Sequence, residues 1–96
     1  MLFLIILQYI KPQVAINTYF GAHEAFLKRY TDTGQFILAG QKVMKNGEFI
    51  LCKAQSRREI EAILREDPFD VYQLAVYETI AQVPLAYAAG LEQYLG

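Results

Sequence analysis

The chain has 96 residues, of which 54% are apolar and 20% charged, and its formal net charge at pH 7 is −1. This length predicts a single domain over residues 1–96, and the scattered lysines and arginines argue against nucleic acid or an anionic membrane surface as a partner. Because the apolar content exceeds that of an average soluble domain, we expect the chain to bury its excess apolar surface in a homodimer or a higher oligomer.

The first element is a short apolar run from Leu2 to Tyr9 that lacks helical spacing and is bounded by Pro12. Such a run is typical of a strand covered on both faces. No basic residue precedes it and it is too short to span a bilayer, so we interpret it as neither a signal peptide nor a membrane anchor. Cys52 is the only cysteine, which excludes an intramolecular disulfide and favours a reducing, cytoplasmic location.

A helix is predicted next, from Gln13 to Thr33. Pro12 suits the first turn of a helix, and the apolar residues that follow recur at steps of three and four. Gly34 can adopt the left-handed conformation that ends a helix.

Two strands rich in β-favouring residues follow, Phe36–Ala39 and Glu48–Ala54. The loop between them contains Asn46-Gly47, which is typical of a hairpin, so the two strands should pair antiparallel. Gly40 ends the first of them, where it would either allow a ligand to approach the backbone or simply form a turn.

The next stretch predicts a helix with a defined start and end. Ser56 and Glu59 have the spacing of a capping box, and Pro68 keeps Asp67 out of the helical conformation, so the helix should finish before Asp67. Asp67 is then held at a fixed bend, with Phe69 able to fold back under the apolar face of the helix. The other interpretation is that this Asp-Pro pair merely begins a turn.

After the bend, the pattern predicts a short helical turn at Val71–Leu74 and a half-buried strand from Tyr77 to Val83. The tail from Leu85 to Gly96 carries apolar and aromatic side chains, and we expect it to pack on something rather than to extend freely. The order βαββαβ indicates an α+β, ferredoxin-like fold with two helices on one face of a four-stranded antiparallel sheet. Both alternating sets of side chains in the first strand are apolar, so a second copy should cover the other face.

The only histidine, His23, lies seven residues after Ile16 and three before Phe26, and therefore on the apolar stripe of the predicted helix. An inward imidazole needs a hydrogen-bond partner, and we select Asp67 because the two helices would lie side by side on the sheet. A carboxylate there would fix the tautomer of His23 and raise its basicity. The alternative is a core histidine that hydrogen-bonds to backbone or to a tyrosine hydroxyl.

Other chemistries have less support. One histidine and one cysteine do not provide the ligands of a zinc site, and no glycine-rich phosphate loop is present, so no metal or cofactor is expected. Cys52 lies in a predicted strand, where a small buried hydrophobe is its ordinary role, and a nucleophile pair with His23 is the weaker hypothesis. Besides His23 and Asp67, three residues are candidates for the lining of a pocket: Gly40, Phe69 and Tyr9.

Taken together, the chain resembles the YCII-related domain family of dimeric α+β barrel proteins. The matching features cover nearly all of the chain and are the opening hydrophobic strand, Ala22-His23 followed by Phe26-Leu27, Gly34-Gln35-Phe36, Leu38-Ala39-Gly40 and Glu66-Asp67-Pro68-Phe69. The resemblance implies a ferredoxin-like fold, two sheets packed into a dimer, and an active site centred on His23 and Asp67. Similar proteins often have a proline after the glycine that follows the second strand, where this chain has Gln41 and Lys42.

The resemblance also implies a class of reaction, since related proteins include a dehydrochlorinase of a hydroxylated aromatic and the fold is similar to that of muconolactone isomerase. On this basis His23 would act as general acid or base in the elimination or isomerisation of a small cyclic or phenolic compound. Asp67 would orient the imidazole and stabilise the imidazolium. The alternative is a noncatalytic module that binds a small ligand or serves assembly, with a structural His–Asp pair.

Overall fold

The computed structural model describes residues 1–95. Within them the strands are β1 (Leu2–Tyr9), β2 (Phe36–Gln41), β3 (Gly47–Lys53) and β4 (Ala75–Gln82), and the helices are α1 (Gln13–Asp32), α2 (Arg57–Leu64), α3 (Pro68–Val71) and α4 (Glu92–Leu95). None of these helices combines the length and the apolar character needed to cross a bilayer.

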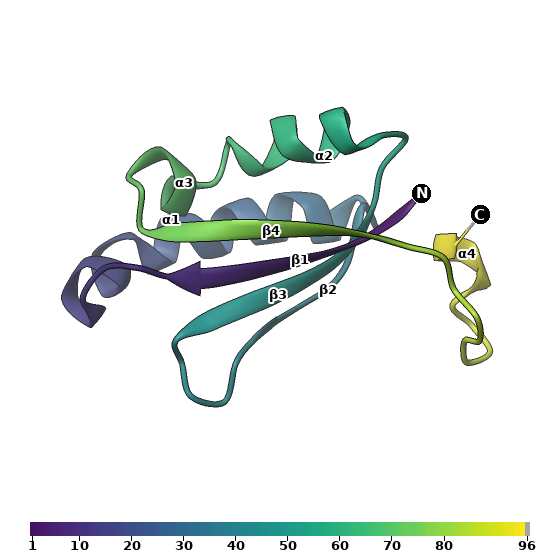
Figure 1. Ribbon diagram of the computed structural model, residues 1–96, viewed down its shortest axis with the longest axis horizontal. Coiled ribbons are helices and arrows are strands. Elements are labelled where there is room, and N and C mark those ends of the chain that lie inside the picture. Colours follow the sequence, from purple (N-terminus) through teal and green to yellow (C-terminus); the bar gives the residue numbers. More distant parts are fainter. Residues whose placement is uncertain (96) are drawn as a thin grey trace.

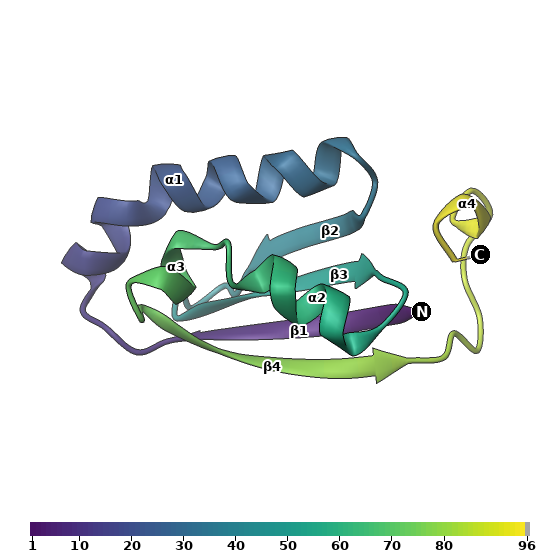
Figure 2. The same ribbon diagram turned by 90° about the horizontal axis from the view of Figure 1, so that it is seen from above.

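The four strands form one antiparallel sheet in the order β2-β3-β1-β4. Figures 1 and 2 show α1, α2 and α3 on the same side of this sheet. The predicted α+β, ferredoxin-like fold is therefore confirmed. The predicted pairing of the two middle strands is also confirmed, with Leu38 opposite Leu51 and a register shift next to Phe36.

The two long helices begin and end close to the predicted residues. α1 starts directly after Pro12, and Gly34 beyond its end has a φ of 80°, which a glycine adopts without strain. The Ser56 side chain caps α2 by accepting a hydrogen bond of 3.2 Å from the Glu59 backbone N–H. The Glu59 carboxylate instead accepts from the Gln55 backbone N–H at 3.0 Å, one residue before the position that a capping box uses.

The short helical turn occurs earlier in the chain than predicted. It is α3, Pro68–Val71, rather than the predicted Val71–Leu74. Asp67 explains the difference, because its Oδ1 accepts a hydrogen bond of 3.0 Å from the Phe69 backbone N–H and so caps a new helix whose first residue is Pro68. The predicted bend at Asp67 is thus both the end of α2 and the start of α3.

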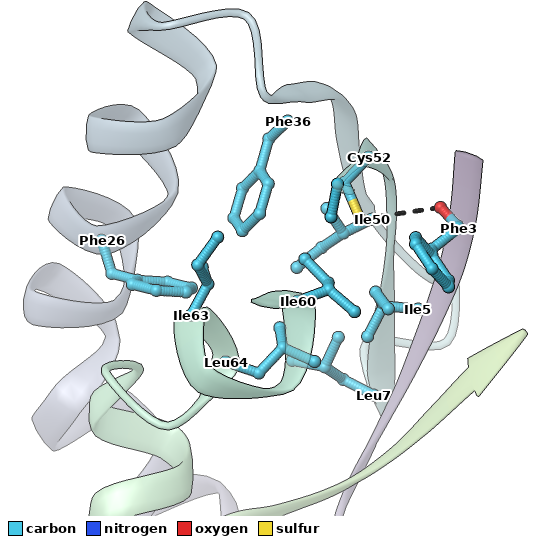
Figure 3. Packing of buried hydrophobic residues seen from close by; sticks show 11 residues of the cluster. Phe3, Ile5, Leu7, Phe26, Phe36, Ile50, Cys52, Ile60, Ile63 and Leu64 are labelled. Carbon is cyan, nitrogen blue, oxygen red and sulfur yellow. Dashed lines mark hydrogen bonds between the residues drawn. The ribbon is translucent and has the colours of Figure 1, made fainter. Parts of the chain in front are cut away.

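The main buried cluster lies between the sheet, α2 and part of α1. Figure 3 shows side chains of α2 pointing toward those of β1 and β3. The cluster consists of Phe3, Ile5, Leu7, Phe26, Phe36, Ile50, Cys52, Ala54, Ile60, Ile63 and Leu64. A second cluster, next to α3, consists of Ile16, Phe69, Leu74 and Ala75.

Cys52 belongs to the main cluster as a small buried hydrophobe, as predicted. Its side chain is fully buried, and its Sγ donates a hydrogen bond of 3.6 Å to the Phe3 carbonyl. Burial raises the pKa of the Cys52 thiol to about 12. At neutral pH the thiolate needed for nucleophilic catalysis is therefore not formed.

Figure 1 shows no element of residues 1–95 over the sheet face away from the helices, where the inner strand β1 presents apolar side chains. Alternate residues of β1 explain this, because Phe3, Ile5 and Leu7 are fully buried whereas Leu2, Leu4 and Ile6 are only partly buried. On the same open face Leu38 and Val76 are 53% and 52% exposed. The predicted strand and its two apolar faces are observed, but within residues 1–95 only one of the two faces is covered.

The segment after β4 runs past the end of the sheet (Figures 1 and 2). Within residues 1–95 the first half of this tail packs on no other part of the chain, since Leu85 is 98% exposed. The tail contacts the rest of the chain again at α4, where the centre of the Tyr94 ring lies 6.0 Å from Nζ of Lys53 in β3. Gly96, the last residue of the predicted tail, lies outside the described residues.

Candidate active site

His23 lies in the middle of α1 and its side chain points into the protein, as its position on the apolar stripe predicts. It is 0% exposed and lies between the two apolar clusters. Its ring stacks on Phe69, with the centroids 4.0 Å apart and the planes 4° from parallel, and lies 6.4 Å from the ring of Phe26. A buried imidazole among aromatic rings requires polar partners for both ring nitrogens.

The first partner is Asp67, which is also 0% exposed. The Nδ1 atom of His23 donates to Oδ1 of Asp67 at 2.7 Å. Asp67 accepts two more hydrogen bonds, from the Phe69 backbone N–H to Oδ1 at 3.0 Å and from the Tyr77 hydroxyl to Oδ2 at 2.6 Å. These three donors stabilise a carboxylate that water does not reach.

The second partner is Glu48 in β3, which the sequence analysis did not identify. The Nε2 atom of His23 donates to Oε1 of Glu48 at 2.6 Å, and Glu48 is 3% exposed. The other carboxylate oxygen, Oε2, accepts a short hydrogen bond from the Tyr9 hydroxyl. One signal could have found Glu48, since it lies two residues before Ile50 and therefore on the same, buried face of the strand.

The two carboxylates determine the charge of the histidine. Burial alone would lower the pKa of His23, but the hydrogen bonds that it donates to Asp67 and Glu48, together with their negative charges, outweigh burial and raise that pKa to about 9. His23 is therefore an imidazolium at neutral pH, donating from both nitrogens. Burial and the neighbouring carboxylates raise the pKa values of the Tyr9 and Tyr77 hydroxyls, which stay neutral donors.

A cleft of about 660 Å³ lies beside this network, lined by residues of α1, β2 and the β2–β3 loop: Gln13, Asn17, Phe20, Gln41 and Lys45. Two of them link it to the buried groups. The Phe20 ring lies 6.0 Å from the His23 ring, edge to face, and Gln41 Nε2 donates to the Tyr9 hydroxyl at 3.3 Å. An aromatic wall, amides and one ammonium suit a small planar ring that carries oxygen atoms.

The structure brings together four of the five residues selected from the sequence. His23 contacts Asp67 and Phe69, and Tyr9 packs edge to face on Phe69 with centroids 5.6 Å apart. Gly40 is not among them, because it lies on the open face of the sheet, opposite to His23. A Cβ atom at Gly40 would be 2.6 Å from Cε1 of Phe49, so this glycine makes room for the Phe49 ring.

The model of the YCII-related domain matches residues 1–86. No curated protein matches the sequence. Among solved structures, the fold is similar to that of a 5-chloro-2-hydroxyhydroquinone dehydrochlorinase from Burkholderia phenoliruptrix AC1100 in complex with 2,5-dihydroxybenzoquinone, with a TM-score of 0.70. The two sequences are 22% identical, and the match covers 86% of this chain and 94% of that chain.

Proposed function

We propose that this chain, which belongs to the YCII-related domain family, is a small-molecule enzyme in which His23 and Asp67 serve proton transfer. The observation that carries the proposal is His23 itself, held 2.7 Å from Asp67 and 2.6 Å from Glu48 beside a cleft. Burying three charged groups costs free energy that apolar residues of similar volume would not. Perturbed titratable groups next to a cleft are characteristic of catalytic sites.

The roles of the residues follow from their protonation states. Because the pKa of His23 is about 9, its imidazole is protonated at neutral pH and acts as the general acid. The Glu48 carboxylate beside it acts as the proton acceptor. Asp67 orients the imidazole and stabilises its positive charge. Positioned proton transfer of this kind typically contributes about 10²–10⁴ to a rate.

Two reaction types fit such a network, and both concern a small cyclic or phenolic compound. In an elimination, the substrate loses a proton to the network, the freed electron pair forms a new π bond, and a halide departs with its bonding pair. In an isomerisation, the network removes a proton from one atom of the substrate and returns one to another atom. Neither reaction needs an oxidant or a reductant.

The experiment uses the substrate and the bound compound named for the structural neighbour as probes. We expect chloride release from 5-chloro-2-hydroxyhydroquinone by the wild-type protein, and a raised melting temperature with 2,5-dihydroxybenzoquinone. Asp67→Asn should slow chloride release by about 10²-fold or more. A folded wild-type protein that neither binds nor converts chlorinated hydroquinones, their quinones or small lactones would contradict the proposal.

A second candidate function is a noncatalytic module that binds a small ligand or serves assembly. One observation favours it: within residues 1–95, every buried polar side-chain atom already has a hydrogen-bond partner. A network satisfied in this way also serves as a structural core. Under this hypothesis 2,5-dihydroxybenzoquinone would bind without any turnover, and replacing His23 would unfold the protein rather than inactivate it.

We further propose that residues 1–96 form one domain that assembles as a homodimer through the open sheet face. Its exposed and partly exposed apolar side chains support this, because each large aliphatic residue moved from water into a contact contributes about 1.5–3 kcal/mol. Half a dozen such residues can exceed the entropic cost of association. The buried free thiol of Cys52 is consistent with a reducing location, which we take to be the cytoplasm.

A further inference from the structure

The buried network ends in a tyrosine hydroxyl on each side, and the two hydroxyls have different surroundings. At one end Tyr77 donates to Asp67 at 2.6 Å and lines a hollow of about 170 Å³. At the other end Tyr9 donates to Glu48 and accepts from Gln41, which lines the cleft of about 660 Å³. Ligand sites usually measure about 300–1,000 Å³, so only the Tyr9 end adjoins a space of suitable size.

The histidine itself is closed to a ligand. Its side chain is 0% exposed and both ring nitrogens are occupied. Phe69 covers one face of the ring at 4.0 Å, and Phe20 lies against it from the side of the cleft at 6.0 Å. A proton that moves between His23 and a ligand therefore has to pass through a neighbouring group.

We propose that Tyr9 is the catalytic residue that meets the ligand, and that Glu48 and His23 act behind it as a proton relay. This inference rests on the proposed function and deepens it. In the forward step a ligand O–H or C–H bond breaks and its proton passes to the Tyr9 hydroxyl oxygen. The proton of that hydroxyl passes to Oε2 of Glu48. The freed electron pair stays on the ligand and forms the new π bond, while the carbon–halogen bond breaks and the halide departs with its bonding pair.

The geometry around Tyr9 suits this role. Its ring is fixed by the edge-to-face contact with Phe69, and its backbone N–H donates to the Asn46 carbonyl at 3.0 Å. The hydrogen bond from Gln41 is long, at 3.3 Å, so a ligand hydroxyl can replace it at little cost. The imidazolium of His23 bonds Oε1 of Glu48, which leaves Oε2, the oxygen bonded to the Tyr9 hydroxyl, to receive the proton.

The test compares two variants that each remove one hydroxyl from the network, Tyr9→Phe and Tyr77→Phe. Its first part needs no substrate: NMR measures how fast the Nε2 proton of His23 exchanges with water. Tyr9→Phe should slow this exchange on the order of tenfold or more, because the proton then has to wait for local opening of the structure. Tyr77→Phe should leave the exchange rate near that of the wild type. Equal rates in all three proteins, or equal slowing in both variants, would overturn the relay.

The second part measures chloride release from 5-chloro-2-hydroxyhydroquinone. Tyr9→Phe should lower kcat by about 10²–10⁴ with KM nearly unchanged. The control for turnover is Tyr30→Phe, which should keep kcat because the Tyr30 hydroxyl bonds Glu66, outside the network. Similar turnover by Tyr9→Phe and the wild type would overturn the catalytic role of Tyr9 and leave the proposed function intact. Slowed exchange in Tyr9→Phe alone would support the relay even if this probe is not a substrate.

Discussion

The imidazole of His23 and the phenyl ring of Phe69 lie parallel, with their centroids 4.0 Å apart. Phe69 follows Asp67 by two residues, so one tight turn around Pro68 supplies both the carboxylate at the edge of the imidazole and the ring on its face. The position of the buried histidine thus depends on a local feature of the chain.

Phe69→Leu should keep a folded protein but destabilise it. Leucine retains much of the buried apolar surface and loses the aromatic contacts with His23, Tyr9 and Phe20. Each aromatic pair contributes about 0.5–1.5 kcal/mol beyond its buried area, so the free energy of unfolding should fall by at least about 1 kcal/mol. Urea unfolding measures the change, and an unchanged midpoint would show that the stacking does not stabilise the site.

Stability should fall at alkaline pH because of His23. Its pKa is about 9 in the folded protein and about 6.5 in an unfolded chain. The folded pKa is the higher one, so the stabilisation is complete below about pH 6.5 and is lost as the pH rises through about 9, in total on the order of 3 kcal/mol. Urea unfolding of the wild type should show this loss between about pH 7 and pH 9.5, and His23→Gln should lack it. Parallel pH curves for the two proteins would contradict the raised pKa.

Asp67→Asn should lower the pKa of His23, because it removes a negative charge and the strongest acceptor at Nδ1. Glu66→Gln is the matched control, since Glu66 precedes Asp67 directly but bonds Arg29 and Tyr30 instead of His23. An NMR titration of the imidazole measures both variants. We expect a lower pKa in Asp67→Asn and the wild-type value in Glu66→Gln, and identical titrations would show that Asp67 does not control the charge of His23.

Much of this site could be predicted from short-range patterns. The helical spacing around His23 places it inward, and Pro68 fixes the bend at Asp67, because both effects act over a few residues. Glu48 was missed for the opposite reason. It follows Asn46-Gly47, where a charged residue is ordinary in a hairpin. Only the approach of His23 from α1 and of Tyr9 from β1 makes it a buried partner in the network.

The predicted and the observed fold differ for two separate reasons, one local to Asp67 and one set by the pairing of strands. The sequence alone did not reveal that Asp67 caps a second helix, so the short helical turn was predicted three residues too late. The face on which Gly40 lies depends on the pairing of β2 with β3 and on the register shift next to Phe36. Such pairings between distant residues are set by the whole sheet and not by local preference.

The homodimer should depend on the open sheet face. Leu51→Glu places a charge in the middle of that face, opposite Leu4 and Leu38, and should convert a dimer into a monomer, since burying an unpaired carboxylate costs several kcal/mol. Val83→Glu is the control, because Val83 is 85% exposed on the tail beyond the sheet. Light scattering should give a dimeric mass for the wild type and Val83→Glu. A wild-type monomer at high dilution would contradict the dimer.

The most direct test of the account is the rate of chloride release from 5-chloro-2-hydroxyhydroquinone by the wild type and by His23→Gln, with circular dichroism confirming that both are folded. We predict release by the wild type and a rate at least about 100-fold lower for the variant. Equal rates in the two folded proteins would contradict the account, because the buried imidazolium would then take no part in the chemistry.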